Sequence, residues 1–180
     1  HFNLYLKNKF LLYAYGKYFW YLEYTNASQI IAAYEGDKLL GVIIVDMKNE
    51  AKPYKSFWKT CYIKLIDQIQ KFFFKGGVMA YNQANKEMFE EYTEKYTPDG
   101  EIRFLAADPD TKLKGIGTML LNEFERRKYG KEIYLFTDDQ CSYPFYEHRG
   151  FERIGEKDIV LELDDKINLK CFLYRKLIQK

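Results

Sequence analysis

The sequence reads Lys112-Leu-Lys-Gly-Ile-Gly-Thr118 between a predicted strand and a predicted helix. The first turn of a helix has backbone N–H groups without intrahelical partners and carries a partial positive charge. Gly115 and Gly117 have no Cβ, so an anion can come close to this backbone. Lys112 and Lys114 add positive charge locally, in a chain whose net charge is only +2. We therefore predict a phosphate-binding loop at a helix N-terminus.

Two known phosphate motifs differ from this loop. A Walker loop needs GxxxxGK followed by Ser or Thr, and the chain has no such run. The dinucleotide fingerprint needs a third glycine at a position where this chain has Leu120. Taken alone, the loop is also compatible with a glycine-rich connection that binds nothing.

Strands and helices are predicted along the whole chain, and they alternate in its second half. The second half is predicted to contain strands, helices and a final hairpin, over 101–107, 115–128, 132–137, 142–149, 151–163 and 168–177. The first half is predicted to contain helical turns that bend or break near Gly16, a hairpin and two further helices, over 8–25, 29–35, 39–46, 57–74 and about 79–95. The strand–helix–strand order at 101–137 predicts at least one parallel βαβ unit.

Composition narrows the class of protein. A chain of 180 residues is expected to form one domain, and 28 basic against 26 acidic residues give too little positive excess for a nucleic-acid-binding protein. Three cysteines without a CxxC pair and two histidines predict no metal site, and the odd number of cysteines favours the cytoplasm. The longest apolar run, Leu39 to Val45, is shorter than the ~18 residues of a membrane span, so no stable membrane insertion is expected.

A second segment, Phe145-Tyr-Glu-His-Arg-Gly-Phe151, follows the strand predicted at 132–137. Together with the glycine loop it resembles the GNAT superfamily of acyl-CoA-dependent N-acyltransferases. That family carries an (R/Q)xxGxG loop after its fourth strand and an FYxxxGF-like segment after its fifth, and Lys112 stands where Arg or Gln is usual. Leu105-Ala-Ala-Asp-Pro109 also resembles the family's strand-into-loop segment, and the close match covers about residues 101–152.

The resemblance implies an α/β (α+β) fold with a GNAT-like mixed, mostly antiparallel sheet that is flanked by helices. The family's parallel fourth and fifth strands splay apart, and they correspond here to 101–107 and 132–137. One GNAT-like acetyltransferase domain is expected over residues 1–180, with a two-helix insertion at about 50–100. The insertion is expected to line an acceptor site, to touch a membrane surface or a partner through its basic amphipathic helix, or simply to cover the sheet. Its aromatic residues include Trp58, Tyr62, Phe72, Phe73 and Tyr81.

The resemblance also implies acetyl-CoA as the cosubstrate, with no metal. The pantetheine arm is expected in the split beside Leu105 and Ala107, and Lys112 is expected near the phosphates. Asp139 stands where the family often has an Asn that helps to hold the cofactor. The pyrophosphate is expected on the backbone N–H groups of Leu113, Lys114, Gly115, Ile116, Gly117 and Thr118.

Acetyl transfer to an amine has three chemical requirements. The amine must lose a proton, because a lysine-like amine with a pKa of about 10.4 is mostly protonated at neutral pH. The oxyanion of the tetrahedral intermediate needs hydrogen-bond donors, and the departing thiolate benefits from a proton. The family places a Tyr beside the sulfur, which implies Tyr146 as the general acid. Backbone N–H groups near Ala107 are expected to meet the oxyanion.

Glu101 is the candidate general base. Alternation along a strand predicts that Glu101 shares a face with Arg103, Leu105 and Ala107, and that it lies about 13 Å before Leu105. The base is therefore expected to act through water. Some protein-modifying members of the family carry a Glu at this place. The alternative interpretation is an exposed Glu after a turn, paired with Arg103.

Other functions are compatible with the sequence. Cys141 and His148 could serve as nucleophile and base in a covalent mechanism. The chain could also be a catalytically idle acyl-CoA-binding or regulatory domain, or an interaction module that works through the basic helix at 55–75. The leading hypothesis is a cytoplasmic N-acetyltransferase in which a small-molecule or peptide amine attacks acetyl-CoA directly. No nucleic-acid partner is expected, and a homodimer is possible.

Overall fold

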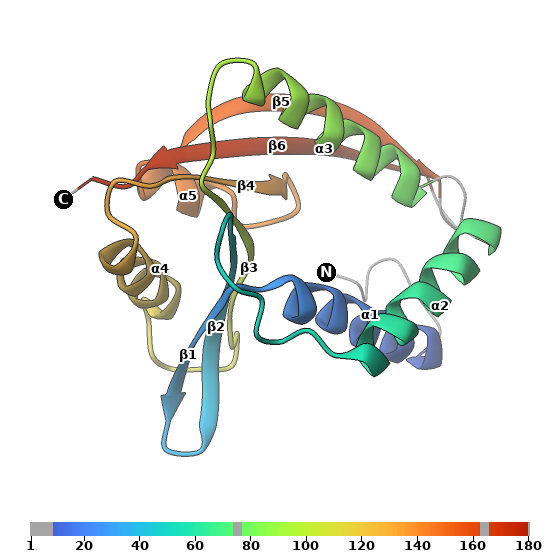
Figure 1. Cartoon of the computed structure of the whole chain (residues 1–180), viewed down its shortest axis with the longest axis horizontal. Coiled ribbons are helices and arrows are strands. Elements are labelled where there is room, and N and C mark those ends of the chain that lie inside the picture. Colours follow the sequence, from blue (N-terminus) through green and yellow to red (C-terminus); the bar gives the residue numbers. More distant parts are fainter. Residues whose placement is uncertain (1–8, 74–76, 163–165, 180) are drawn as a thin grey trace.

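The computed structural model describes residues 9–73, 77–162 and 166–179, and its centre is a six-stranded sheet (Figure 1). The strands follow the spatial order β1-β2-β3-β4-β6-β5, and neighbours are antiparallel except for the parallel pair β3 and β4. This confirms the predicted mixed, mostly antiparallel sheet. The strands are β1 (Gln29–Glu35), β2 (Lys38–Met47), β3 (Gly100–Ala107), β4 (Glu132–Asp138), β5 (Glu152–Glu162) and β6 (Lys166–Leu177).

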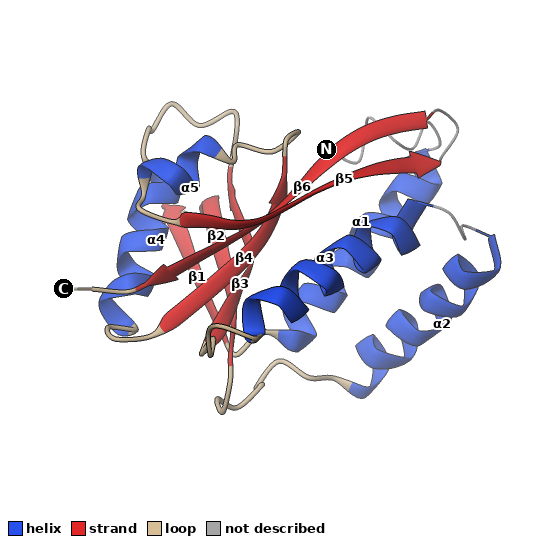
Figure 2. Ribbon diagram, turned by 90° about the horizontal axis from the view of Figure 1, so that it is seen from above, coloured by secondary structure: helices blue, strands red, loops and turns tan. Residues whose placement is uncertain are grey.

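Helices cover both faces of the sheet (Figure 2). α4 (Ile116–Arg127) and α5 (Pro144–His148) lie on one face. The other face carries α1 (Lys9–Asn26) and α3 (Gly77–Thr93), and α2 (Phe57–Phe73) lies outside α1. None of the described helices combines the length and the apolar character that crossing a membrane requires.

Helix α1 differs from its prediction. It runs without a break through Gly16, because a single glycine costs a helix only about 1 kcal/mol. Phe74, at the end of the helix predicted over 57–74, and Leu163, at the end of the strand predicted over 151–163, lie outside the described residues.

The helices pack through the apolar stripes that the sequence predicts. On α4, the residues Ile116, Leu120 and Phe124 recur at helical spacing and are buried against the sheet. On α3, Met88 and Tyr92 are buried with residues of β5 and β6. The predicted covering layer is therefore confirmed for α3, whereas α2 packs on α1 rather than on the sheet.

The first turn of α4 lies directly on β2. A Cβ on Gly41 would come within 2.7 Å of Ile116 Cγ2 and within 2.8 Å of the Ala106 carbonyl oxygen. Both distances are too short for a real contact, so glycine at position 41 permits this close approach. Gly41 thereby sets the position of the glycine loop, which immediately precedes α4.

β3 and β4 pair only where both strands begin. In the described chain, Gly100 is paired with Ile133 and Glu101 with Tyr134, and the two strands separate beyond these pairs. The predicted splay of the parallel strands is therefore confirmed. The separation leaves one edge of β3 without a neighbouring strand over most of its length.

A β-bulge lies in β3 at the start of the split. On β2, Val45 is opposite Ile102 and Ile44 is opposite Phe104, so Arg103 is an extra residue without a partner. A bulge bends its strand and increases the local twist. The bulge therefore turns β3 at the point where it parts from β4.

The bulge contradicts one sequence prediction. Strict alternation places Glu101, Arg103, Leu105 and Ala107 on one face of the strand. Instead, Arg103 donates a hydrogen bond to Glu23 on α1, whereas Leu105 packs against the core under α4. Because the bulge adds one residue, Glu101 and Arg103 face α1, and Leu105 and Ala107 face α4.

Candidate active site

The glycine loop presents the N-terminus of α4 at the surface. Gly115 precedes the helix with a φ of 82°, a left-handed conformation that glycine adopts without strain. The Met119 amide donates to the Gly115 carbonyl oxygen at 2.9 Å, so the amides before Met119 have no helical acceptor. Gly115 is exposed, and a Cβ there would meet nothing within 4 Å. Glycine is thus needed at this position for its φ angle rather than for space.

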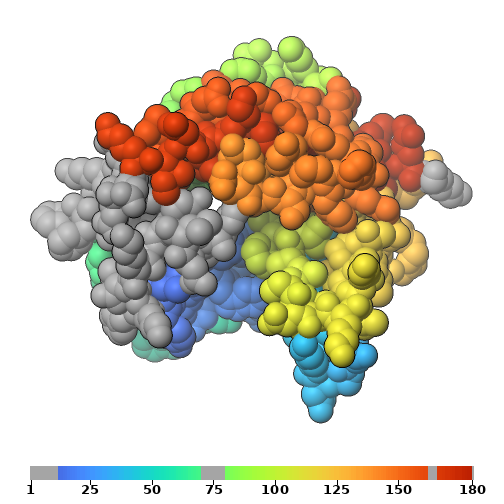
Figure 3. Space-filling model, turned by 180° about the vertical axis from the view of Figure 1, so that it is seen from behind, coloured from blue at the N-terminus to red at the C-terminus, as the bar shows by residue number. Residues whose placement is uncertain are grey.

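Asp108 makes contacts that hold the start of the loop, and these contacts do not involve Lys112 or Lys114. The Asp108 carboxylate accepts a hydrogen bond from the Asp110 amide at 2.9 Å and pairs with Lys38 Nζ at 2.8 Å. The hydrogen bond from Lys38 holds the pKa of Asp108 below its ordinary value. Lys112 and Lys114 are exposed and have no ion-pair partner among the described residues. Figure 3 shows the loop (yellow) at the surface beside the β1–β2 hairpin (cyan).

Helix α5 brings the second motif against the loop. A Cβ on Gly117 would lie 3.6 Å from Cζ of Phe145. Phe145, Tyr146 and Leu105 all pack against the core under α4. The motif also closes on itself, because the Phe151 amide donates to the Tyr146 carbonyl oxygen at 3.0 Å. The structure thus places Phe145 against the loop, and it packs Leu105 and Tyr146, which are far apart in the sequence, against the same core.

Tyr146 is a largely buried phenol that keeps its proton. Its ring contacts those of Phe145, Phe151 and Tyr174 at centroid distances of 5.4, 5.6 and 6.2 Å. Burial and, to a smaller extent, nearby Cys141 raise the pKa of Tyr146 to about 12. The phenol is therefore neutral at ordinary pH and can act as a proton donor.

Glu101 lies on the opposite face of the sheet, in a network with Arg103 and Tyr134. Arg103 Nη1 donates to Glu101 Oε2 at 3.2 Å, and the Tyr134 hydroxyl donates to the same oxygen at 3.3 Å. The predicted pairing with Arg103 is confirmed, but Glu101 is 20% exposed rather than open to solvent. Burial raises the pKa of Glu101 above its ordinary value, although the positive charge of Arg103 opposes the shift. A raised pKa makes the carboxylate a better proton acceptor.

Sequence reasoning missed two residues of this network. Glu23 on α1 accepts hydrogen bonds from Arg103 Nε and Nη2 at 2.6 and 3.2 Å, and only 6% of Glu23 is exposed. A signal existed, because Glu23 is the single acidic residue in the aromatic-rich run 9–26, and a buried charge needs a partner. Tyr134 is a neighbour of Glu101 through the parallel register of β3 and β4, for which a single sequence carries no signal.

A hollow of about 380 Å³ lies beside Glu101, where β2 ends and where β3 and β4 begin. Five of its nine lining residues are charged, and Lys52 pairs with Asp46 across 2.6 Å. Such a wall suits a polar or charged ligand better than an apolar one. The lining residues are Asp46, Met47, Lys48, Asn49, Glu50, Lys52, Gly100, Glu101 and Tyr134.

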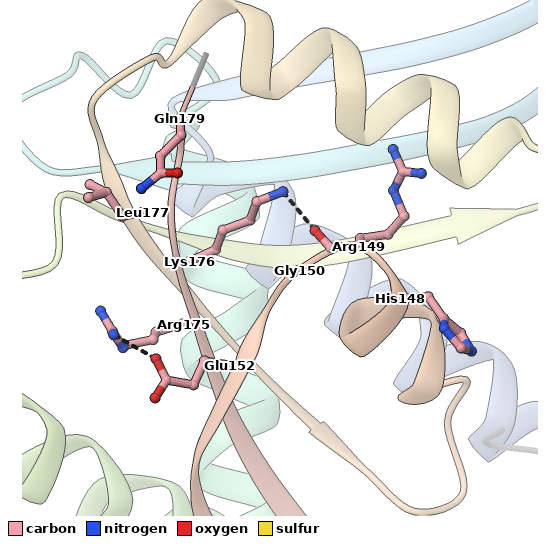
Figure 4. Close-up of a pocket in the computed structure, with 8 residues that line it drawn as sticks. All are labelled: His148, Arg149, Gly150, Glu152, Arg175, Lys176, Leu177 and Gln179. Carbon is pink, nitrogen blue, oxygen red and sulfur yellow. Dashed lines mark hydrogen bonds and ion pairs between the residues drawn. The ribbon is translucent and has the colours of Figure 1, made fainter.

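A second cavity, of about 570 Å³, lies between the end of α5 and the end of β6 (Figure 4). Two cationic side chains that line it already form hydrogen bonds within the protein. Arg175 Nη2 donates to Glu152 at 2.6 Å, and Lys176 Nζ donates to the Arg149 carbonyl oxygen at 2.7 Å (Figure 4). Neither the glycine loop nor Tyr146 lines this cavity. We therefore do not assign it to the candidate site.

Asp139 has a structural part in the sheet. Its amide donates to the Lys170 carbonyl oxygen at 3.0 Å, and its carboxylate accepts from the Lys170 amide at 3.3 Å. These bonds join the end of β4 to β6 and leave an exposed carboxylate that has no proton to donate.

The environment of Cys141 disfavours a nucleophilic thiolate. Burial, followed by the charge of Asp138, raises the pKa of Cys141, so the thiol stays protonated. His148 is exposed, lines the second cavity and is not among the groups that shift this pKa. The geometry therefore gives no support to a covalent mechanism based on Cys141 and His148.

The aromatic residues of the 50–100 segment do not form one wall. Trp58 is 80% exposed, the Tyr62 hydroxyl donates to the Ala14 carbonyl oxygen on α1 at 3.3 Å, and Tyr81 packs beside the core under α3. The side chains of Phe72 and Phe73 lie outside the described residues. An acceptor wall built from this set is therefore not supported.

Comparisons with known proteins match the chain to one family. The model of the Acetyltransferase (GNAT) family matches residues 2–151. No curated protein matches the chain. Solved structures do match, among them a GNAT-family acetyltransferase from Bacillus cereus ATCC 10987 with 10% identity and a TM-score of 0.43, covering 84% of this chain and 72% of that chain.

Two further structures give similar figures. An N-acetyltransferase from Staphylococcus aureus Mu50 has 14% identity and a TM-score of 0.45, and the match covers 83% of this chain and 67% of that chain. A ribosomal-protein-alanine N-acetyltransferase from Brucella melitensis has 12% identity and a TM-score of 0.43, with 82% of this chain and 67% of that chain covered. At such low identities and TM-scores, these structures carry no argument about activity.

Proposed function

The chain belongs to the acetyltransferase (GNAT) family, and we propose that it moves an acetyl group from acetyl-CoA to a primary amine by direct attack. The observation that carries this proposal is the arrangement of residues around the split between β3 and β4. The glycine loop, Leu105 and Tyr146 lie on the α4 side of the sheet, and Glu101 lies on the α1 side. Donor and acceptor would therefore approach the split from opposite faces.

The donor-side residues fit acetyl-CoA. We place the pantetheine arm beside Leu105 and Ala107, along the edge of β3 that does not pair with β4. We place the pyrophosphate on the backbone N–H groups of residues 113–118, where Lys112 and Lys114 add positive charge that no carboxylate of the described chain neutralises through an ion pair. A role for Asp139 has weaker support, because its carboxylate already accepts a hydrogen bond from Lys170.

The donor side also holds the proposed acid. The amine nitrogen attacks the thioester carbonyl carbon, the C–S bond of the tetrahedral intermediate breaks, and the thiolate takes the phenolic proton of Tyr146. The pKa of about 12 keeps that proton on Tyr146 until it is needed. General acid catalysis of this kind contributes roughly 10²- to 10⁴-fold. We assign the oxyanion to backbone N–H groups near Ala107.

Glu101 is the proposed base, and it would take the amine proton through water. Its raised pKa favours this role, and the hydrogen bonds from Arg103 and Tyr134 hold the carboxylate in one position. The hollow beside Glu101 offers the acceptor a place with polar walls. A small-molecule or peptide amine is the acceptor that we propose.

Three wider expectations accompany this proposal. We regard residues 1–180 as one acetyltransferase domain with a two-helix insertion at about 50–100. We keep the cytoplasm as the proposed location, which is supported by three cysteines that form no disulfide with one another, Cys61, Cys141 and Cys171. A homodimer stays a prediction.

Acetyl-CoA-dependent release of free thiol tests the function. The panel contains polyamines, aminoglycosides, amino acids and lysine peptides, with a reaction that lacks acceptor as the control. Release with one class of amine, lost in Tyr146→Phe, supports the proposal. If acetyl-CoA neither raises the melting temperature nor releases thiol with any amine, the proposal fails, because a ligand of the folded state must stabilise it. A rise in melting temperature without turnover favours an idle acyl-CoA-binding domain.

A further inference from the structure

One face of α2 exposes a continuous apolar stripe. Trp58, Leu65 and Ile69 are 80%, 59% and 41% exposed, and Phe57 at the start of the helix is 74% exposed. The exposed Cys61 lies between Trp58 and Leu65, because residues three and four apart are neighbours on a helix. Figure 2 shows α2 at the outer edge of the helix layer. A contiguous exposed apolar patch of this kind marks an interaction surface.

The stripe is separate from the face through which α2 packs. Ile63 is buried, and the Tyr18 hydroxyl of α1 donates to Asp67 Oδ1 at 2.6 Å. Tyr62 also donates to a backbone carbonyl of α1. A rotation that buried the stripe would break these contacts, so the stripe is a second apolar face of the same helix.

The layer formed by α1 and α2 is basic. Residues 9–26 and 57–73, which form α1 and α2, together carry a net charge of +3, although the whole chain is only +2. The two acidic residues of these helices already have partners in the fold, because Glu23 accepts a hydrogen bond from Arg103 and Asp67 accepts one from Tyr18. The lysines of these two helices are Lys9, Lys17, Lys59, Lys64 and Lys71, and Lys55 lies just before α2.

We propose that the outer face of α2 binds the surface of a membrane that contains anionic lipids. The helix has 17 residues and would lie flat, with Trp58, Leu65 and Ile69 at the boundary between headgroups and acyl chains. Indole and phenyl rings are favoured at this depth. The exposed Lys55 and Lys64 flank the stripe and would meet the anionic headgroups.

Other occupants fit the same surface less well. In a symmetric contact between two copies of α2, the same lysines would face one another, and no carboxylate on the stripe could pair with them. A nucleic acid would use the lysines but would leave Trp58 and Leu65 without apolar partners. Only an anionic lipid surface matches both the apolar stripe and the positive charge beside it.

Co-sedimentation of the full chain with vesicles tests the proposal. The protein should bind vesicles of phosphatidylcholine mixed with phosphatidylserine, should bind phosphatidylcholine alone much less, and should be released by salt. Lys64→Gln should weaken binding about fivefold, as expected for one lysine charge near such a surface. The double variant Trp58→Ser/Leu65→Ser should lose binding. Val160→Ser, which changes a similarly exposed apolar residue on β5, should bind normally.

Four outcomes would overturn the proposal. They are binding to neither kind of vesicle at low salt, equal binding to both kinds, binding that survives Trp58→Ser/Leu65→Ser, and a comparable loss in Val160→Ser. Light scattering can reveal a fifth contradicting outcome. If the unmodified chain is a dimer, the double variant is a monomer and neither binds vesicles, the stripe is the contact between two copies of the chain. Circular dichroism melting checks that each variant is folded. None of these readouts depends on acetyl transfer, so this inference can fail independently of the proposed activity.

Discussion

Arg103 on β3 donates two hydrogen bonds to Glu23 on α1, from Nε to Oε2 at 2.6 Å and from Nη2 to Oε1 at 3.2 Å. The two residues are 80 positions apart in the chain, and 6% of Glu23 is exposed. The remaining guanidinium nitrogen, Nη1, donates to Glu101. One arginine therefore fixes α1 on the sheet and orients the candidate base.

Arg103→Met should lower the free energy of unfolding by about 3–5 kcal/mol, because it leaves the charge of Glu23 buried without a partner. Urea denaturation measures the loss. Adding Glu23→Gln should recover much of it, since the unpaired charge is then gone. Arg126→Met is the matched control, because its partner Glu123 lies at the surface, and it should cost less than about 1 kcal/mol. Equal losses in the two arginine variants would contradict a buried Glu23–Arg103 pair.

Tyr146→Phe should keep the affinity for acetyl-CoA and lower kcat roughly 10²-fold or more, because the phenol supplies a proton only during the reaction. Calorimetric titration gives the affinity, and initial rates with the best amine give kcat. Tyr129→Phe, a change at an exposed tyrosine, is the control and should behave like the unmodified protein. Unchanged turnover in Tyr146→Phe would remove this residue from the mechanism.

In the profile of kcat/KM against pH, the midpoint of the acidic limb should lie above about 4.3, the pKa of an ordinary glutamate. Burial raises the pKa of Glu101, so its carboxyl stays protonated to a higher pH and cannot accept a proton there. Activity should therefore fall as the pH falls through this raised pKa. Tyr134→Phe should move the limb to still higher pH, because the Tyr134 hydrogen bond stabilises the charged carboxylate.

Rate–pH profiles of Glu101→Gln decide whether Glu101 is the base. The variant should lose the acidic limb and should be slower on the plateau, since an amide cannot accept the amine proton. If the acidic limb of the variant lies at the same pH as in the unmodified protein, Glu101 is not the general base.

Gly115→Ala should cost about 1–2 kcal/mol of stability, because alanine is strained at a φ of 82°. It should also weaken acetyl-CoA binding, since the strain is relieved by moving the loop. Gly130→Ala is a matched control: Gly130 has a φ of 76° and open space around its Cβ position. Both variants should melt at lower temperature, but only Gly115→Ala should lose affinity. An equal effect on affinity would mean that the loop is not the phosphate site.

Much of the fold was predictable because its signals are local. The strand at 29–35 ends at Gly36-Asp37, and β1 has these same bounds. The apolar spacing of Ile116, Leu120 and Phe124 predicts the buried face of α4. The glycine loop and the segment around Tyr146 each stand out by residue type. Gly117 and Phe145 bring the two motifs into contact, and a common role for them on the donor side stays a prediction.

The acceptor side was harder to predict because its signals are not local. Glu23 meets Arg103 only after the chain has folded, and Tyr134 reaches Glu101 through the register of a parallel strand pair. The bulge at Arg103 leaves no mark in a single sequence, yet a shift of one residue reverses every later side chain of a strand. The alternation of side chains therefore predicted the strand correctly, but it placed Leu105 on the same face as Glu101, which is wrong.

The bulge also has a consequence for how such an enzyme can diverge. It is a property of the backbone, so exchanging side chains along β3 does not remove it. On the proposed function, the residues before it meet the acceptor and those after it meet the donor. Changes around Glu101 and the hollow can then alter which amine is chosen without repacking the core under α4. Preference for a new amine can evolve while the recognition of acetyl-CoA is inherited unchanged.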